Sequence, residues 1–377
     1  MRLALIGTGR MGTPIAARLR GAGHRLVVHD ASPAARERLA ADGFDVAADP
    51  AAAVRGAEVV LLCLPDAGAV ASVVGRLPEV PLLVDLTSSL PSATRGLGRR
   101  MVDAPLSGGV GGAAAGNLTA MVGGEAALVE EARPVLAAFA SQVFHAGGLG
   151  AGHAAKALNN ALSAVALSAT SEAVAAGRSA AHRPEGTIRR INTGLGRTQN
   201  SEVKFPRDIL PGAYASGFTA GLMLKDVGIA LAIAAERECP APLVAAVREE
   251  WRLVVHQLGA NADFTRVYEV VAGWGPSTHG NARCDLDHFD RAVAAACLLG
   301  AREMVAVAEA EGLQRDRFLE IVNAGSGRSE ATRHFADGLG FQPRQAARSL
   351  DAVRQVAAAG EQAVPVLALA AELWKQC

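Results

Sequence analysis

The sequence predicts an α/β domain followed by an all-α region, and two observations support this prediction. Short apolar strands alternate with helical segments over about the first 150 residues, which is typical of a doubly wound parallel sheet. Beyond residue 150 the strand-like runs stop, and alanine-rich helical segments continue towards the end of the 377-residue chain. We therefore expect one α/β domain over residues 1–150 and helical domains after it.

A glycine-rich turn follows the first predicted strand. Leu3–Ile6 leads into G-T-G-R-M-G, and a helical segment then runs to about Arg20. In a G-x-G-x-x-G turn between a strand and a helix, the first glycine makes the turn, the second lets a pyrophosphate approach, and the third allows close packing. The helix N-terminus then faces the phosphates with its N–H groups. This context predicts a Rossmann domain in which a dinucleotide is bound by Gly7, Gly9, Arg10, Met11 and Gly12.

The second predicted strand, Arg25–His29, is followed directly by Asp30. A carboxylate at this place accepts hydrogen bonds from the adenosine ribose hydroxyls and repels a 2′-phosphate. No arginine follows directly, because the next three residues are Ala-Ser-Pro. The sequence therefore predicts NAD in preference to NADP. The alternative is a carboxylate that only caps a turn.

Two further predicted strands end in candidate cofactor contacts. Glu58–Leu64 runs into Pro65, and Pro81–Leu86 runs into Thr87. In a doubly wound sheet these strand ends border the cofactor crevice. Leu64, Pro65 and Thr87 are therefore expected near the nicotinamide half, although ordinary loop residues would look the same.

A second glycine-rich stretch reads S-G-G-x-x-G-A-x-x-G-x-L from Ser107 to Leu118. Adjacent glycines after a serine expose successive backbone N–H groups, which suit a carboxylate. A strand over Thr119–Val122 follows and ties the predicted loop down. We expect Ser107, Gly108 and Gly109 to bind the acid end of a substrate.

The stretch Gly147–Asn160 begins with glycines and continues as a helix without proline to about Gly177. Lys156 and Asn160 are four residues apart, so they share one helix face. Standing alone, a lysine in an alanine-rich helix is usually only solvated. Here it follows a predicted cofactor domain and a predicted acid-binding loop, which favours a catalytic interpretation.

Four separated motifs together resemble the β-hydroxyacid dehydrogenase family, which includes 3-hydroxyisobutyrate dehydrogenase and tartronate semialdehyde reductase. The resemblance covers about residues 1–275. The motifs are Gly7–Gly12; Asp103-Ala-Pro105 with Ser107-Gly108-Gly109 and Gly116; Gly147 with Lys156 and Asn159-Asn160; and Phe218 with Leu224-Lys225-Asp226.

This resemblance implies an NAD-dependent oxidoreductase that moves a hydride between the cofactor and the carbinol carbon of a 3-hydroxy acid, or reduces the matching semialdehyde. Lys156 would be the general acid/base, which requires burial or a nearby cation to lower its pKa. Asn160 and Ser107 would act beside it on the substrate. Lys225 would close the pocket against the cofactor and Asp226 against the substrate, unless the two are only a surface ion pair.

Three other functions remain open from the sequence. A decarboxylating enzyme similar to 6-phosphogluconate dehydrogenase is favoured by a duplicated helical domain, but Asp30 argues against NADP. Imine reductases of the same superfamily tend to replace the lysine that this chain keeps as Lys156. A non-catalytic cofactor-binding protein is disfavoured by the retained Asn160 and Ser107.

The last hundred residues look like a degenerate copy of the preceding helical domain. At an offset of 131, the N-x-G-x-G-R stretch from Asn192 to Arg197 aligns with Asn323 to Arg328. At the same offset Glu172 aligns with Glu303. After a deletion of eight, Phe218 meets Phe341 and Pro242 meets Pro365. The candidate catalytic residues are not kept: Lys156, Asn160, Lys225 and Asp226 meet Asp287, Arg291, Arg348 and Ser349.

We therefore expect three domains: residues 1–150 bind NAD, 151–275 form a helical catalytic and substrate domain, and 276–377 form a structural repeat that begins with a linker at Gly275–Arg283. The repeat is expected to pack on the first copy as an internal pseudo-dimer, so that the chain is a monomer or a homodimer. Its residues would then line the far side of the pocket.

Composition excludes several other classes of protein. Lysines and arginines number 37, as do aspartates and glutamates, and no block of like charge appears. Neither nucleic acid nor an anionic membrane is therefore an expected partner. Five scattered cysteines without a C-x-x-C pair, and a chain that starts directly in a strand, predict a reduced cytoplasmic protein without a metal site. No apolar run is long enough for a membrane span.

Overall fold

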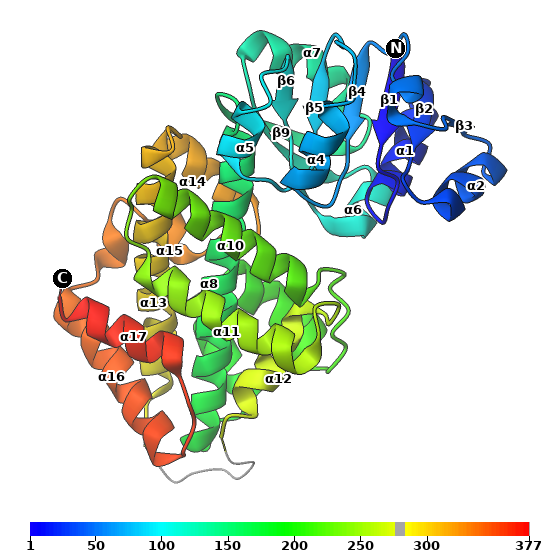
Figure 1. Ribbon diagram of the computed structural model, residues 1–377. Helices are drawn as coiled ribbons and strands as arrows, with labels where there is room; N and C mark the ends of the chain where they lie inside the picture. Colours follow the sequence, from blue (N-terminus) through cyan, green and yellow to red (C-terminus); the bar gives the residue numbers. More distant parts are fainter. Residues whose placement is uncertain (276–282, 377) are drawn as a thin grey trace. The chain divides into compact units, whose positions relative to one another are not determined.

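The computed structural model describes residues 1–275 and 283–376, and it divides into two compact units (Figure 1). Unit 1 comprises Met1–Ala157 and Glu311–Arg317, and unit 2 comprises Leu158–Ala310 and Phe318–Cys377. Both helical copies predicted from the sequence therefore lie mainly in unit 2. Residues 276–282 of the predicted linker lie outside the described residues.

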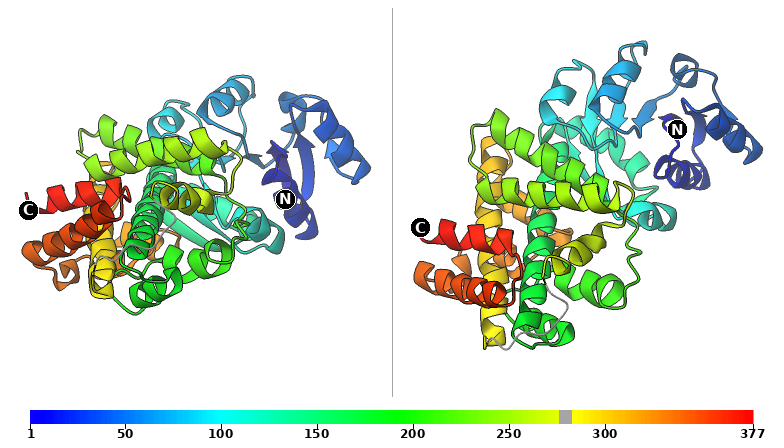
Figure 2. Two further views of the ribbon diagram at one scale, coloured as in Figure 1. Left: turned by 90° about the horizontal axis from the view of Figure 1, so that it is seen from below. Right: turned by 60° about the horizontal axis from the view of Figure 1, so that its bottom comes forward.

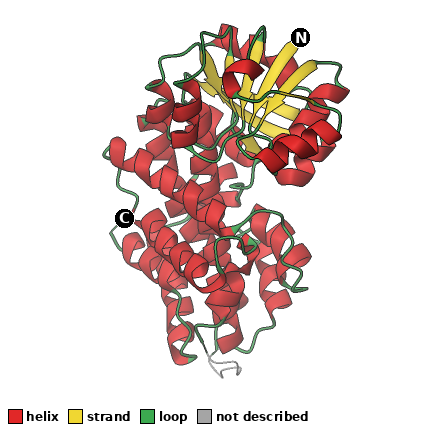
Figure 3. Cartoon of the chain, turned by 45° about the vertical axis from the view of Figure 1, so that its right-hand side comes forward, coloured by secondary structure: helices red, strands yellow, loops and turns green. Residues whose placement is uncertain are grey.

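Unit 1 is built on a nine-stranded sheet in the order β3-β2-β1-β4-β5-β6-β8-β7, with β9 paired to β8 (Figure 3). The pairs among β1 to β6 are parallel, whereas β8 is antiparallel to β6 and β7 and parallel to β9. The strands are β1 (Arg2–Ile6), β2 (Arg25–His29), β3 (Asp45–Val46), β4 (Val59–Leu62), β5 (Leu83–Asp85), β6 (Met101–Asp103), β7 (Leu106–Ser107), β8 (Leu118–Gly123) and β9 (Ala140–Gly147).

Both faces of this sheet are buried. Leu3 and Leu5 of β1 join one apolar cluster and Ala4 and Ile6 join another, as alternation along a strand requires. The strand order reverses at β1, which is where doubly wound sheets bind ligands. The helices of the unit are α1 (Gly12–Gly21), α2 (Pro33–Ala41), α3 (Pro50–Ala53), α4 (Ala67–Val74), α5 (Pro91–Arg95), α6 (Gly109–Ala115) and α7 (Ala126–Leu136).

From residue 151 onward the described chain is helical apart from loops, turns and isolated bridges. The 29-residue α8 (Ala151–Ser179) starts in unit 1 and continues in unit 2. No helix among the described residues is long and apolar enough to cross a bilayer. The remaining elements are α9 (Pro184–Asn192), η1 (Asn200–Ile209), α10 (Ala220–Glu236), α11 (Pro242–Leu258), η2 (Phe264–Arg266), α12 (Val267–Ala272), α13 (Leu286–Ala310), α14 (Arg315–Ala324), α15 (Glu330–Arg333), η3 (Gly338–Gly340), α16 (Pro343–Ala359) and α17 (Pro365–Trp374).

The stretch around Pro206 is helical. A proline normally interrupts a helix. The structure instead forms a π-helix over Asn200–Ile209. Phe205 and Ile209 are buried in it, and the amide of Asn200 donates to the Ser163 carbonyl oxygen at 2.9 Å. Tertiary burial therefore overrides the local sequence signal here.

Helices in the two predicted copies have bounds that match at fixed offsets. Residues 155–179 of α8 correspond to α13 at an offset of 131, and α10 corresponds to α16 at an offset of 123. Glu238 after α10 and Glu361 after α16 both have a φ of 53°, which is uncommon for residues other than glycine. In Figure 2 the orange-red α16 and the red α17 lie beside the yellow α13.

The two copies cap each other's helices. The backbone N–H groups of Val366 and Leu367, at the start of α17, donate to the carboxylate of Glu172 on α8, each at 2.8 Å. In return, Leu243 N and Val244 N, at the start of α11, donate to Glu303 on α13 at 2.8 and 3.0 Å. Each long helix therefore supplies a carboxyl group that accepts hydrogen bonds at the N-terminus of a helix in the other copy.

A short segment of the second copy packs within unit 1. Arg95 forms an ion pair with Glu311, and Arg317 Nε donates to the carbonyl oxygen of His145 at 2.8 Å. The Arg317 guanidinium also lies 5.3 Å from the ring centroid of Phe144. The segment Glu311–Arg317 thus belongs to the packing of the sheet-containing unit.

A buried carboxyl pair makes the stability of the helical unit sensitive to a rise in pH. Burial raises the pKa of Glu250 to about 7, and burial together with Glu250 raises that of Glu172 well above its usual value. A raised folded-state pKa stabilises the protein below the unfolded value of about 4.5, and this contribution is lost as the pH rises through about 7.

We therefore expect the melting temperature to fall by roughly 5 °C or more between pH 5 and 8. Glu250→Gln should flatten that profile in a thermal-melt series. Glu250→Leu is the matched variant, because Leu373 occupies the equivalent place in the second copy. Equal slopes for the wild type and both variants would show that this pair does not set the pH dependence.

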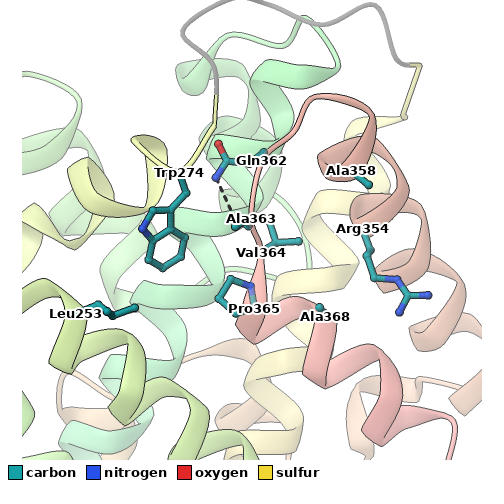
Figure 4. A pocket seen from close by; sticks show the side chains of 9 residues that line it. All are labelled: Leu253, Trp274, Arg354, Ala358, Gln362, Ala363, Val364, Pro365 and Ala368. Carbon is teal, nitrogen blue, oxygen red and sulfur yellow. Dashed lines mark hydrogen bonds between the residues drawn. The ribbon is translucent and has the colours of Figure 1, made fainter.

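An apolar groove of about 600 Å³ lies between the copies (Figure 4). Leu253 and Trp274 line it from the first copy, and Arg354 and Pro365 are among the lining residues of the second. Gln362 also lines it, and its amide donates to Val271 O at 2.8 Å and to Ala363 O at 3.0 Å. None of the residues predicted to bind cofactor or substrate lines this groove.

Candidate active site

The glycines of the first turn have distinct structural reasons. Gly7 has a φ of +97°, and a Cβ there would lie 2.2 Å from the Cys63 carbonyl oxygen. A Cβ at Gly12 would lie 2.0 Å from the Gly7 carbonyl oxygen, whereas one at Gly9 would meet no atom within 4 Å. Packing therefore requires Gly7 and Gly12, and the open space at Gly9 fits the approach of a pyrophosphate. Arg10 is exposed and Met11 packs partly against the core.

Asp30 stands at the end of β2 with both carboxylate oxygens engaged. Thr8 donates to Oδ2 from its backbone N at 2.7 Å and from its hydroxyl at 3.0 Å, and Ser32 N donates to Oδ1 at 2.9 Å. Partial burial acts to raise the pKa of Asp30, but the hydrogen bonds from Ser32 and Thr8 outweigh it and hold the pKa below its usual value. Asp30 is therefore a carboxylate at neutral pH.

Sequence reasoning missed a cation beside Asp30. Arg36, on the first turn of α2, donates from Nη1 to the carbonyl oxygens of Asp30 and Ala31 at 2.7 and 3.1 Å. The only signal was an arginine six residues after the carboxylate, which becomes a neighbour because α2 starts at Pro33.

The structure brings the ends of β4 and β5 together. Leu64 N donates to the hydroxyl of Thr87 at 3.2 Å, and Thr87 N donates to Asp85 Oδ1 at 2.9 Å. Thr87 is buried, and Leu64 and Pro65 follow the last residue of β4. Leu64, Pro65 and Thr87, predicted from two separate strands, thus lie together at the carboxyl ends of β4 and β5.

The predicted acid-binding loop is partly helical. Ser107 ends β7, Gly108 has a φ of +121°, and Gly109 begins the seven-residue α6 with a φ of +64°. The helix ends at Gly116, which adopts the left-handed conformation. Local sequence gave no sign of this helix, because three of its seven residues are glycine.

Buried ionisable groups fix the start of the helix that carries Lys156. Asp103, at the end of β6, accepts from Gly150 N at 2.7 Å and from His153 N at 2.6 Å. His153 Nε2 lies 3.5 Å from Asp85 Oδ2. Burial raises the pKa of Asp103, although the nearby His153 and these hydrogen bonds oppose that rise. Lys156 follows one turn later and is only 6% exposed, so it is not the solvated surface lysine that its sequence context alone would suggest.

Within unit 2 the structure brings Asn160 and Asp226 together. The Asn160 amide nitrogen donates to Asp226 Oδ2 at 2.6 Å, and both residues are buried. Lys225 precedes Asp226 on α10 and is half-buried. Sequence reasoning missed Ser326 of the second copy, whose hydroxyl lies 3.1 Å from the Asn159 amide nitrogen.

The second copy has different residue types at the positions equivalent to Lys156 and Asp226. Asp287 stands where the first copy has Lys156, and it accepts from Arg190 Nε at 2.6 Å. Ser349 replaces Asp226 and lies 3.4 Å from His288 Nδ1. Ion pairs therefore occupy the position of the candidate base.

Two known protein families match this chain, one over the sheet-containing part and one over the first helical copy. Residues 2–148 match the family described as the NAD binding domain of 6-phosphogluconate dehydrogenase. Residues 150–271 match the family described as NAD-binding of NADP-dependent 3-hydroxyisobutyrate dehydrogenase.

Two Pseudomonas aeruginosa enzymes are similar over most of their length. 3-Hydroxyisobutyrate dehydrogenase is 37% identical over 276 residues, which are 67% of this chain and 91% of the relative. NAD-dependent L-serine dehydrogenase is 35% identical over 289 residues, which are 71% of this chain and 97% of the relative.

Solved structures extend the comparison. Mycobacterium tuberculosis 3-hydroxyisobutyrate dehydrogenase with L-serine has a TM-score of 0.67 at 31% identity, over 71% of this chain and 98% of that chain. Plasmodium falciparum 6-phosphogluconate dehydrogenase has a TM-score of 0.71 at 12% identity, over 100% of this chain and 92% of that one. The second likeness concerns the fold alone, and it includes the second helical copy. The chain belongs to the family of 3-hydroxyisobutyrate dehydrogenase and related β-hydroxyacid dehydrogenases, oxidoreductases that act on a CH–OH group.

Proposed function

We propose that the chain oxidises the hydroxymethyl group of a small 3-hydroxy acid with NAD, or reduces the matching semialdehyde with NADH. The observation that carries this proposal is the buried Lys156, one helical turn before an Asn160 that is hydrogen-bonded to Asp226. Substrates named for two relatives, 3-hydroxyisobutyrate and L-serine, share the unit HO–CH2–CH(R)–COO⁻. We take that unit as the substrate class.

The reaction removes a hydride from the carbinol carbon and a proton from the hydroxyl group, leaving an aldehyde. When bound, the nicotinamide supplies the hydride acceptor. Lys156 Nζ takes the hydroxyl proton in oxidation and returns it in reduction. Asn160 holds the substrate hydroxyl, with Asp226 orienting its amide. Ser107, Gly108 and Gly109 bind the carboxylate through hydroxyl and backbone donors.

The cofactor contacts follow from the same elements. Gly9 leaves open space at the N-terminus of α1, where backbone N–H groups suit the phosphates. Asp30 accepts from the adenosine ribose, and Leu64, Pro65 and Thr87 border the nicotinamide half. The full proposed cofactor set is Gly7, Gly9, Arg10, Met11, Gly12, Asp30, Leu64, Pro65, Thr87 and Lys225.

The function is tested by following NADH formation with a substrate panel. The panel contains 3-hydroxypropionate, 3-hydroxyisobutyrate and L-serine, with lactate as a control because its hydroxyl is on the 2-carbon. Turnover of at least one 3-hydroxy acid and none of lactate is expected. Turnover confined to 2-hydroxy acids, or none with any member while NAD still binds, would contradict the proposed substrate class.

NAD is the proposed cofactor because Asp30 is ionised where a 2′-phosphate would sit. Asp30→Ala should lower the ratio of kcat/KM for NAD to kcat/KM for NADP by about 10- to 100-fold, the range expected for losing a charged hydrogen bond and a charge repulsion. Arg36→Ala serves as the matched variant, because it should shift the ratio the other way. An unchanged ratio in the Asp30 variant would place the source of cofactor choice elsewhere.

We further propose that the internal copy takes the place of a dimer partner, so that the chain acts as a monomer with an internal pseudo-dimer. Reciprocal capping by Glu172 and Glu303 supports this proposal. Sedimentation of the intact chain tests it, and a stable homodimer at low micromolar concentration would contradict it.

A further inference from the structure

The second copy, which lacks the candidate catalytic residues, nevertheless contacts the asparagine pair of the first. The turn that follows α14 carries Ser326 and Gly327. Gly327 N donates to Asn159 Oδ1 at 3.0 Å. The Asn159 amide nitrogen donates to Ser326 Oγ at 3.1 Å and to Asn160 Oδ1 at 3.1 Å. Ser326 Oγ in turn lies 3.5 Å from Asn160 Oδ1, as its donor.

These contacts determine which way both amides face. A backbone N–H can only donate, so the Asn159 oxygen faces Gly327 and its nitrogen faces Ser326 and Asn160. A carboxylate can only accept, so the Asn160 nitrogen faces Asp226 at 2.6 Å. The Asn160 oxygen then faces the two donors, Asn159 and Ser326. Asn159 and Asn160 are buried, which strengthens the hydrogen bonds between them.

The internal repeat provides a natural comparison. At the equivalent place, Asp290 of the second copy accepts from Gly196 N at 2.7 Å and Leu195 N at 3.3 Å in the first copy. A Cβ at Gly194 would lie 2.3 Å from Asp290, as one at Gly325 would lie 2.6 Å from Asn159. Capping of the turn is therefore common to both copies.

The residue at the tip of the turn differs between the copies. Ser326 faces the intact pair Asn159-Asn160. Its equivalent in the first copy is Leu195, which is 38% exposed. The asparagine pair itself is not kept in the second copy, because Arg291 stands at the position of Asn160. A hydroxyl is thus present only where there is a candidate catalytic amide to orient. Packing of the turn alone does not require it, because the turn with leucine is capped in the same way.

We propose that Ser326, supplied by the second helical copy, is a positioning residue that acts through Asn160. It holds the Asn160 oxygen in place, so that the amide keeps one orientation towards the substrate hydroxyl while Asp226 holds the nitrogen. This inference rests on the proposed role of Asn160 in substrate binding. It assigns the degenerate copy a part in the reaction beyond structural support.

The test is steady-state kinetics of the full chain with 3-hydroxyisobutyrate or L-serine, whichever the wild type turns over. Ser326→Ala should lower kcat/KM for the hydroxy acid by roughly 3- to 10-fold, the usual weight of one neutral hydrogen bond. The KM for NAD and the melting temperature should stay at wild-type values. Ser326→Thr should restore activity, and Leu195→Ala, the matched variant on the other turn, should leave all three quantities unchanged.

A double-mutant cycle separates this inference from the proposed function. In the Asn160→Ala background, Ser326→Ala should cause no further loss, because Ser326 acts through the missing amide. If Asn160→Ala lowers turnover strongly and Ser326→Ala does not, the inference is wrong and the proposed function stands. If Asn160→Ala leaves turnover intact, the proposed role of Asn160 itself fails. A Ser326→Ala variant that loses stability and NAD binding along with turnover, without rescue by threonine, would show a merely structural role.

Discussion

Replacement of Lys156 by alanine is expected to lower kcat by about 10²-fold or more, the contribution of a positioned acid/base. The variant keeps the cofactor residues of unit 1, so its affinity for NAD should be unchanged. Because the start of α8 is held by Asp103 through Gly150 N and His153 N, the helix should still form. Single-turnover NADH formation and NAD binding by fluorescence would separate the two effects.

The internal repeat supplies the control for that experiment. Asp287 occupies the position of Lys156 in the second copy and pairs with Arg190 near the surface. Asp287→Ala should leave kcat within the error of the assay, since partly exposed pairs contribute little. A Lys156→Ala enzyme with nearly full turnover would remove the lysine from the mechanism.

Truncation after Gly275 should have the largest effect on folding. It would strip α13 and α17 from the first copy, exposing apolar residues of α8 such as Leu162 and Val165 that are now buried. Glu172 would also lose its two backbone donors on α17. We expect the shortened chain to aggregate or to pair with a second copy of itself, measured by light scattering. A soluble, monomeric and fully active product would contradict the pseudo-dimer account.

A point substitution in the full chain tests the same interface more gently. A Cβ at Gly300 of α13 would lie 3.0 Å from Val165 Cγ1 of α8. Gly300→Leu should therefore lower the free energy of unfolding by about 1–3 kcal/mol, which is the usual cost of overpacking a core. Gly228 has no atom within 4 Å of an added Cβ, so Gly228→Ala is the control that should not destabilise.

The parts of the fold that could be predicted are those with short-range signals. The turn from Gly7 to Gly12 could be recognised because a side chain at Gly7 or Gly12 would clash with nearby backbone atoms. The repeat could be recognised because its offset of 131 links glycines of the turn, such as Gly196 and Gly327, whose lack of a side chain is needed for contact with Asp290 and Asn159.

What sequence reasoning missed depends on distant partners. The π-helix over Asn200–Ile209 forms around Pro206 because its apolar side chains are buried and Ser163 accepts from Asn200. Ser326 is 166 positions from Asn160, and it occupies a variable position of the repeated N-x-G-x-G-R stretch, where the first copy has Leu195. His153 reads as an ordinary helix residue until the sheet brings Asp85 and Asp103 to it. Such pairings arise only when the chain has folded.

The most direct measurement of the central claim is the fate of the hydrogen on the carbinol carbon. The enzyme would be given NAD and 3-hydroxyisobutyrate or L-serine carrying two deuterium atoms on the hydroxymethyl carbon, and the reduced cofactor would be analysed by mass spectrometry. Direct hydride transfer predicts one deuterium in each molecule of NADH, formed by the wild type and nearly absent with Lys156→Ala. NADH that forms without deuterium, or no NADH from either substrate while NAD binds, would contradict the account.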